Sequence, residues 1–179
     1  MKPYKIPDVE IELVHACIAG DRKAQRALYD RYKNAMYSSA LRILGNIDEA
    51  SDALQEAFID VFEQIRQFRF ESSLGAWIKT IVIRKALHRL KLVRMNEPLE
   101  SATTIETDTW HGTIDAGYLE KAIQSLPEGT KTVFLLIEVE GYKHKEVSEM
   151  LGISTGTSKS QLNYAKNILQ KILYKYYKQ

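Results

Sequence analysis

The chain has 179 residues, with 25 lysines and arginines against 23 aspartates and glutamates, so its formal net charge is only +2. This length suits one large or two small domains, and the single cysteine, Cys17, excludes an internal disulfide bond. Four scattered histidines without ligand spacing argue against a metal centre, and no apolar run is long enough to cross a membrane. We therefore expect a cytoplasmic protein without cofactor, metal or stable membrane insertion.

Positive charge is concentrated in two parts of the chain. Residues 66–95 contain eight lysines and arginines against one glutamate, and residues 142–179 contain seven lysines against two glutamates. Between them, residues 96–117 contain five acidic residues and no lysine or arginine. Two basic blocks around an acidic connector indicate a polyanionic partner rather than a membrane, because no lipidation signal accompanies them.

Four helices are predicted in the first half of the chain, where apolar residues recur every three to four positions. Their expected ranges are 9–19, about 22–44, about 49–67 and about 74–94. The second, third and fourth of these helices each have a candidate N-cap residue at their start, which would accept hydrogen bonds from the free backbone N–H groups of the first turn. These candidates are Asp21, Asp48 and Ser73.

The third predicted helix has a polar outer face opposite its apolar side. This face includes Asp52, Gln55, Glu56 and Ile59. One interpretation is an ordinary solvated acidic surface, and the other is a docking surface for a basic partner.

The segment after this helix, residues 68–73, interrupts the periodicity with Phe-Arg-Phe-Glu-Ser-Ser. Its phenylalanines either pack into the core or form a platform on which an unpaired base stacks. The polar side of the following helix is dense in cations and is a candidate for phosphate contacts. It comprises Lys79, Arg84, Lys85, His88, Arg89, Lys91 and Arg94.

Residues 96–114 lack a helical period and basic charge, which predicts an extended linker. Helical periodicity resumes at Asp115, stops at Pro127 and returns over 130–140. We therefore predict an all-α fold of two small helical bundles, residues 9–95 and 115–179, joined by the extended linker 96–114.

The stretch from Gly141 to Leu173 has the pattern of a helix-turn-helix. Gly152 follows an apolar helical face, where a residue that tolerates positive φ ends a helix. Ser154 and Thr155 are both N-cap candidates for a second helix that exposes lysines. The alternative is a plain helical hairpin that is basic only for solubility.

Two residues of the second helix do not suit this pattern. Ser158 stands where an apolar residue should pack on the first helix. Gly156 costs roughly 1 kcal/mol relative to alanine inside a helix, although it lets the backbone approach a phosphate closely.

Three runs, taken in this order, resemble the extracytoplasmic-function (ECF) sigma factors of bacterial RNA polymerase, which belong to the sigma-70 family. The first is Asp52 to Phe62 (DALQEAFIDVF), similar to the family's core-binding helix. The second is Phe68 to Trp77 (FRFESSLGAW), and the third is Gly141 to Leu162 (GYKHKEVSEMLGISTGTSKSQL). The resemblance extends from about Leu13 to Leu173 and implies a promoter-specificity subunit rather than an enzyme.

The resemblance also implies roles for particular residues. Core polymerase would be bound by Asp52, Gln55, Glu56 and Ile59. The minus-ten element, with one flipped base, would be bound by Phe68, Arg69, Phe70, Glu71, Ser72, Ser73, Trp77, Lys79, Arg84, Lys85 and His88. The minus-thirty-five element would be read by Thr157, Lys159, Ser160, Gln161, Asn163 and Tyr164. The acidic linker would thread the polymerase channels, and an anti-sigma factor would be a further partner.

The chain departs from the family pattern at four of these or neighbouring positions. Where this chain has Arg84 and His88, members commonly carry asparagine and aspartate. Where it has Gln161 and Ser158, members favour arginine and valine. Glutamine pairs with adenine edges whereas arginine prefers guanine, so the resemblance does not define the promoter sequence. The alternatives to a sigma factor are a helix-turn-helix regulator that acts without core polymerase and a helical interaction module that binds no DNA.

Overall fold

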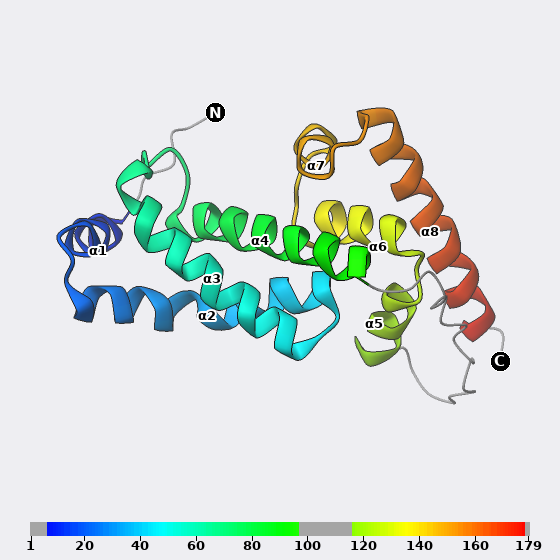
Figure 1. The fold of residues 1–179 in the computed structure, drawn as a ribbon. Coiled ribbons are helices and arrows are strands. Elements are labelled where there is room, and N and C mark those ends of the chain that lie inside the picture. Colours follow the sequence, from blue (N-terminus) through cyan, green and yellow to red (C-terminus); the bar gives the residue numbers. More distant parts are fainter. Residues whose placement is uncertain (1–6, 97–115, 178–179) are drawn as a thin grey trace. The chain divides into compact units, whose positions relative to one another are not determined.

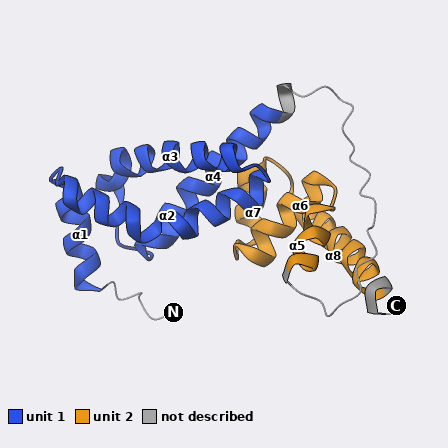
Figure 2. Ribbon diagram, turned by 90° about the horizontal axis from the view of Figure 1, so that it is seen from below, with its two compact units in different colours: residues 1–97 blue, residues 98–179 orange. Residues whose placement is uncertain are grey.

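The computed structural model describes residues 7–96 and 116–177, and every regular element within these ranges is helical (Figure 1). The chain divides into two compact units, residues 1–97 and 98–179 (Figure 2). The all-α prediction is confirmed for the described residues, and nearly all of the predicted linker lies outside them. No helix in the described ranges is both long and apolar enough to cross a membrane.

The first unit is built on three long helices that pack on one another, with a shorter helix across one end. Its elements are α1 (Asp8–Ile18), α2 (Arg22–Leu44), α3 (Ile47–Gln64), the 3₁₀ turn η1 (Ile65–Gln67) and α4 (Leu74–Asn96). Helices α2, α3 and α4 make mutual contacts, while α1 packs on α2 and η1. Fully buried aliphatic side chains from all of these elements form the core, including Val14, Leu28, Ile43, Val61, Ile65, Leu74, Ile78 and Ile83.

Helix ends in this unit are set by short polar residues and glycine. Asp21 Oδ1 accepts a hydrogen bond from Lys23 N at 2.7 Å, and Ser73 Oγ accepts one from Ala76 N at 3.2 Å, so both predicted caps are confirmed. The predicted cap Asp48 is wrong, because Asn46 Oδ1 accepts from the backbone N–H of Asp48 at 2.9 Å. Asn46 has the extended backbone of a cap (φ −129°), whereas Asp48 lies in the first turn, where its charge complements the helix dipole.

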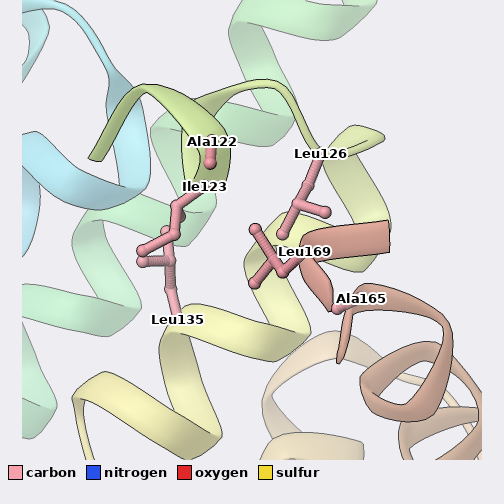
Figure 3. Packing of buried hydrophobic residues seen from close by; sticks show 6 residues of the cluster. All are labelled: Ala122, Ile123, Leu126, Leu135, Ala165 and Leu169. Atoms are coloured by element: carbon pink, nitrogen blue, oxygen red, sulfur yellow. The ribbon is translucent and has the colours of Figure 1, made fainter. Parts of the chain in front are cut away.

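The second unit packs α5 (Ala116–Gln124), α6 (Glu128–Phe134) and the π-helical turn η2 (Leu135–Val139) against α8 (Thr155–Tyr177), with α7 (His144–Leu151) beside them. Its core cluster draws on α5, the turn that follows α5, η2 and α8. Figure 3 shows these side chains converging: Ala122, Ile123, Leu126, Leu135, Ala165 and Leu169. The regular helix expected over 130–140 is corrected: it begins at Glu128 and ends in the π turn, where Glu140 N donates to Leu135 O at 2.9 Å.

Helices α7 and α8 form a helix-turn-helix. Gly152 ends α7 in the left-handed conformation (φ 66°), and Ile153 N donates back to Ser148 O at 3.1 Å. Ser154 Oγ then accepts from Thr157 N at 2.9 Å and caps α8. Figure 1 shows α7 nearly end-on while α8 runs across the view, so the two helices cross steeply. This geometry excludes the plain antiparallel hairpin.

Candidate functional site

The outer face of α3 is open to solvent. Asp52, Gln55 and Glu56 are exposed, and Ile59 beside them has 58% of its surface accessible. An isoleucine this exposed loses the benefit of burying its apolar side chain unless a partner covers it. The face therefore combines two carboxylates with one exposed apolar side chain.

Arg89 of α4 holds three carboxylates of α3 together. Its guanidinium donates to Glu49 Oε2 at 2.8 Å, Asp52 Oδ2 at 2.9 Å and Glu56 Oε1 at 2.5 Å. The hydrogen bond to Glu49 is the main cause that raises the pKa of Arg89. Because these three carboxylates lie three to seven residues apart on one helix, they would repel one another without the guanidinium.

Lys85 belongs to the same network, since its Nζ lies 2.8 Å from Asp60 Oδ2 and 3.9 Å from Glu56 Oε2. The expectation that Lys85 and Arg89 share one cationic face with Arg84 is therefore wrong. Both side chains turn toward α3, where Coulomb attraction is strongest, and four carboxylates surround two cations. The acidic surface keeps a local excess of two negative charges.

A separate face of α4 presents Trp77, Arg84 and His88. Residues seven positions apart lie almost above one another on an α-helix, so Trp77, Arg84 and Lys91 share this side. Arg84, His88 and Lys91 are exposed, and Trp77 is half-buried at the start of the row. Lys79 is half-buried and lies about 140° away from Arg84 around the helix axis. The structure thus groups Trp77, Arg84 and His88 and places Lys79 and Lys85 elsewhere.

The two phenylalanines of loop 68–73 have different environments. Phe68 is buried, with its ring centroid 5.4 Å from that of Trp77 and 4.8 Å from that of Phe70. Phe70 is half-buried and presents part of its ring at the surface. Phe68 therefore packs into the core. Phe70 is partly exposed, and its role as a stacking platform stays a prediction.

Phe70 is also the one non-glycine residue with positive φ (60°) among the described residues. A bulky side chain in this conformation costs roughly 1–3 kcal/mol, and it persists only where surrounding contacts hold it. Arg69 and Glu71 are exposed on either side, and Ser72 and Ser73 are half-buried. The loop is therefore a strained, aromatic surface feature next to the row that begins at Trp77.

Helix α8 exposes most of the residues expected to read DNA. Thr157, Lys159, Ser160, Asn163 and Tyr164 are accessible, and Tyr164 has 54% of its surface exposed. Gln161 differs, because its Oε1 accepts a hydrogen bond from the Thr130 hydroxyl of α6. Its carbonyl oxygen is thus used within the unit.

One exposed residue on this face was absent from the sequence-based set. Asn167 lies seven positions after Ser160, so it continues the same row along α8. Helical periodicity alone would have found it.

Within residues 7–96 and 116–177, no group of three or more His, Cys, Asp or Glu side chains is placed to hold a metal ion.

Ser158, the apparent mismatch in the helix-turn-helix, is fully buried and hydrogen-bonded. Its Oγ lies 2.9 Å from Nδ1 of His144, the first residue of α7. A polar pair takes the place of an apolar contact between the two helices. The hydroxyl is therefore accommodated without an unsatisfied polar group.

We expect Ser158→Ala to destabilise the second unit by about 1–2 kcal/mol, because it leaves the ring nitrogen of His144 without its partner. Hydrogen exchange of α7 and α8 amides measures this loss separately from the first unit. Ser160→Ala is the control, since its hydroxyl is exposed and donates only to Thr157 O in its own helix. Equal protection in the two variants would show that the buried pair contributes nothing.

Gly156, the second residue of α8, is not required by the fold. An added Cβ would meet only Ser154 Oγ, at an ordinary 3.5 Å. Its backbone is in the helical region, unlike that of Gly152. The absence of a side chain at this position therefore has no cause within the described residues and leaves room for a close external partner.

Replacement of Gly156 by alanine is expected to act in opposite directions on folding and binding. It should stabilise α8 by about 0.5 kcal/mol, because alanine has less backbone entropy to lose. It should also weaken DNA binding several-fold by holding a phosphate away from the backbone. Gly129→Ala is a matched control, since Gly129 is the second residue of α6 and has open space around it. Denaturant titration and promoter binding by the assembled polymerase measure the two effects, and unchanged promoter affinity would refute the close approach.

Two family models match the chain, one in each unit. The model for sigma-70 region 2 matches residues 28–94, which contain α3, the loop and most of α4. The model for sigma-70 region 4 matches residues 116–169, which contain the helix-turn-helix. Both therefore coincide with the surfaces described above.

Curated relatives and solved structures agree with these matches. The chain is 27% identical to "ECF RNA polymerase sigma factor SigM" of Mycobacterium tuberculosis over 92% of this chain and 84% of the relative. It is 28% identical to "ECF RNA polymerase sigma-E factor" of Haemophilus influenzae over 88% of this chain and 92% of the relative. In structure it is similar to the sigma factor RpoE of Bartonella quintana, solved with the anti-sigma factor NepR, with a TM-score of 0.58 at 21% identity over 83% of this chain and 96% of that one. The chain belongs to the sigma-70 family, as a member of its extracytoplasmic-function group.

Proposed function

We propose that this protein binds core RNA polymerase, directs it to promoters and assists their melting. The observation that supports this most directly is the presence of two separate sigma-70 matches, regions 2 and 4, each on a unit with an exposed polar surface. A helix-turn-helix regulator needs only the second unit. The exposed face of α3 then has no role in DNA recognition, whereas a polymerase subunit uses both units.

In this proposal, residues 9–95 bind core polymerase and the minus-ten element. Asp52, Gln55, Glu56 and Ile59 form the docking face for a basic polymerase surface, consistent with the local negative charge around Arg89. Phe70 receives one unpaired base, and Trp77, Arg84 and His88 follow the melted strand. Residues 96–114 connect this domain to the next one.

Residues 115–179 bind the minus-thirty-five element through α8 in the major groove. Thr157, Lys159, Ser160, Asn163 and Tyr164 are open to contact bases and phosphates. Two DNA-binding units on one chain reinforce each other only when both engage at once, and core polymerase would impose that arrangement. We therefore expect weak promoter binding by the free protein.

Further properties follow from this role. Sigma factors are initiation factors rather than enzymes, and we propose that this chain has no catalytic activity of its own. It would act in the cytoplasm, where polymerase and promoters are found. The structural relative RpoE was solved in complex with the anti-sigma factor NepR. Another structural relative, CnrH, was solved in complex with the cytosolic domain of CnrY. We propose that an anti-sigma factor also controls this chain.

Footprinting with and without core polymerase separates the proposal from its rival. The purified protein should co-purify with core polymerase, and a promoter footprint covering both elements should appear only in the complex. A sequence-specific footprint by the free protein, unchanged on addition of core enzyme, would instead identify a regulator that acts alone. Absence of salt-dependent DNA affinity in both samples would indicate an interaction module.

A further inference from the structure

Phe70 contacts two aromatic side chains, one in its own loop and one in α1. One partner is Phe68 in the same loop, with ring centroids 4.8 Å apart and planes inclined at 55°. The other is His15 in the last turn of α1, with centroids 6.1 Å apart and planes at 82°, an edge-to-face arrangement. Phe70 is thus enclosed by one buried ring and one exposed ring.

These contacts account for the positive φ of Phe70. An L-residue with a bulky side chain leaves this conformation unless its side chain is held. Phe68 is itself fixed by Trp77 and by burial, so it supports Phe70 from the core side. His15 supports it from the solvent side, and α1 is anchored against η1, immediately before the loop. A loss of His15 therefore removes the support that faces the solvent.

We propose that His15 is a positioning residue for the base-binding loop: its ring holds Phe70 in the conformation on which an unpaired nucleotide base stacks. This inference rests on the proposed function and extends the minus-ten surface to α1, which the sequence-based set of residues did not include. The partner is any planar base with a free face, because stacking on phenylalanine needs no particular hydrogen-bonding edge. His15 acts on the base through Phe70.

A simpler role for His15 has to be distinguished from this one. A histidine in the last turn of a helix can stabilise the negative end of the helix dipole by its charge. His15→Phe keeps an aromatic ring that cannot carry a charge, whereas His15→Lys supplies a positive charge and removes the ring. The two variants therefore test the two roles in opposite directions.

The experiment uses the full chain assembled with core polymerase. The DNA is a fork-junction duplex from a promoter mapped with the wild-type complex, with 2-aminopurine at successive unpaired positions of the minus-ten element. Its fluorescence reports stacking of the extruded base. Because stacking on an aromatic ring quenches this fluorescence, we expect His15→Ala to raise it. The same variant should slow promoter opening about three- to ten-fold, the range of one aromatic pair. His15→Phe should stay within about two-fold of wild type, and His15→Lys should behave like His15→Ala.

Core affinity and thermal unfolding are measured for the same variants. Both should remain near wild type, because His15 is exposed and lies outside the α3 face. Val9→Ala is the control, since Val9 is an exposed residue of α1 with 67% of its surface accessible. Normal stacking and opening by His15→Ala, or rescue by lysine but not by phenylalanine, would overturn the inference while leaving the sigma-factor assignment intact. Failure of the wild-type chain to assemble with core or to open any promoter would refute the proposed function itself.

Discussion

Replacement of Ile59 by aspartate will lower the affinity for core RNA polymerase by about 30-fold or more, the effect typical of an interface hot spot. The exposed isoleucine lies between carboxylates on α3, so in the complex it would supply the apolar contact and the carboxylates the charge complementarity. Aspartate loses the apolar contact and places a charge where water is excluded. Fluorescence titration of labelled protein with core enzyme measures the change.

The matched control is the same substitution at Ile47. This residue is also on α3 and is 67% exposed, but it is the first residue of the helix and lies about 120° around the axis from Ile59. Aspartate in a first helical turn is favourable, so folding should be preserved. Equal losses of core affinity in the two variants would remove Ile59 from the docking face.

Charge reversal at Asp52 and Glu56 is a less specific test of the same face. Both carboxylates accept hydrogen bonds from Arg89, so lysines at these positions would bring three cations together. Weakened association would then have two causes, lost docking charge and a disturbed α3–α4 contact. Ile59 avoids this ambiguity because its side chain carries no charge and forms no ion pair.

Alanine substitutions at Phe68 and Phe70 will separate folding from function in the loop. Phe68→Ala should destabilise the first unit by about 3–5 kcal/mol, because Phe68 is buried against Trp77. Phe70→Ala should cost about 1 kcal/mol or less, since the ring is half-exposed and one of its neighbours is at the surface. It should nevertheless slow promoter opening about 10- to 100-fold through loss of base stacking.

Denaturant unfolding of the free protein and opening kinetics of the assembled polymerase measure these two effects. Phe70→Tyr serves as the control, because it keeps the ring and should open promoters close to the wild-type rate. Comparable opening rates for Phe70→Ala and Phe70→Tyr would show that no base stacks on this residue.

Local sequence signals were sufficient for most helix ends and for the helix-turn-helix. Asp21, Ser73, Gly152 and Ser154 act where short-range capping rules predict. Asn46 and Asp48 are both acceptable caps, and the sequence offers no means of choosing between them. The π turn at Leu135–Val139 likewise carries no local signal, because it depends on how α6 packs in its unit.

Side-chain partners across the fold were the part that sequence reasoning missed. Arg89 lies 33 to 40 residues from the carboxylates it binds, and Gln161 lies 31 residues from Thr130. Such groups meet only when the helices pack. For this reason the basic residues of α4, which form one run in the sequence, lie on two different faces of the helix in the structure. The separation of Lys79 from Arg84, in contrast, follows from the helical period alone, because five residues advance the helix by well over a full turn.

Transcription in vitro with purified core polymerase tests the central claim most directly. A fragmented bacterial genome serves as template, and the 5′ ends of transcripts are mapped with and without the protein. The proposed function predicts a defined set of new start sites that share two upstream sequence elements at fixed spacing, and their loss with Ile59→Asp. Transcripts that are identical in the presence and absence of the protein, despite its binding to core enzyme, would contradict its role in promoter recognition.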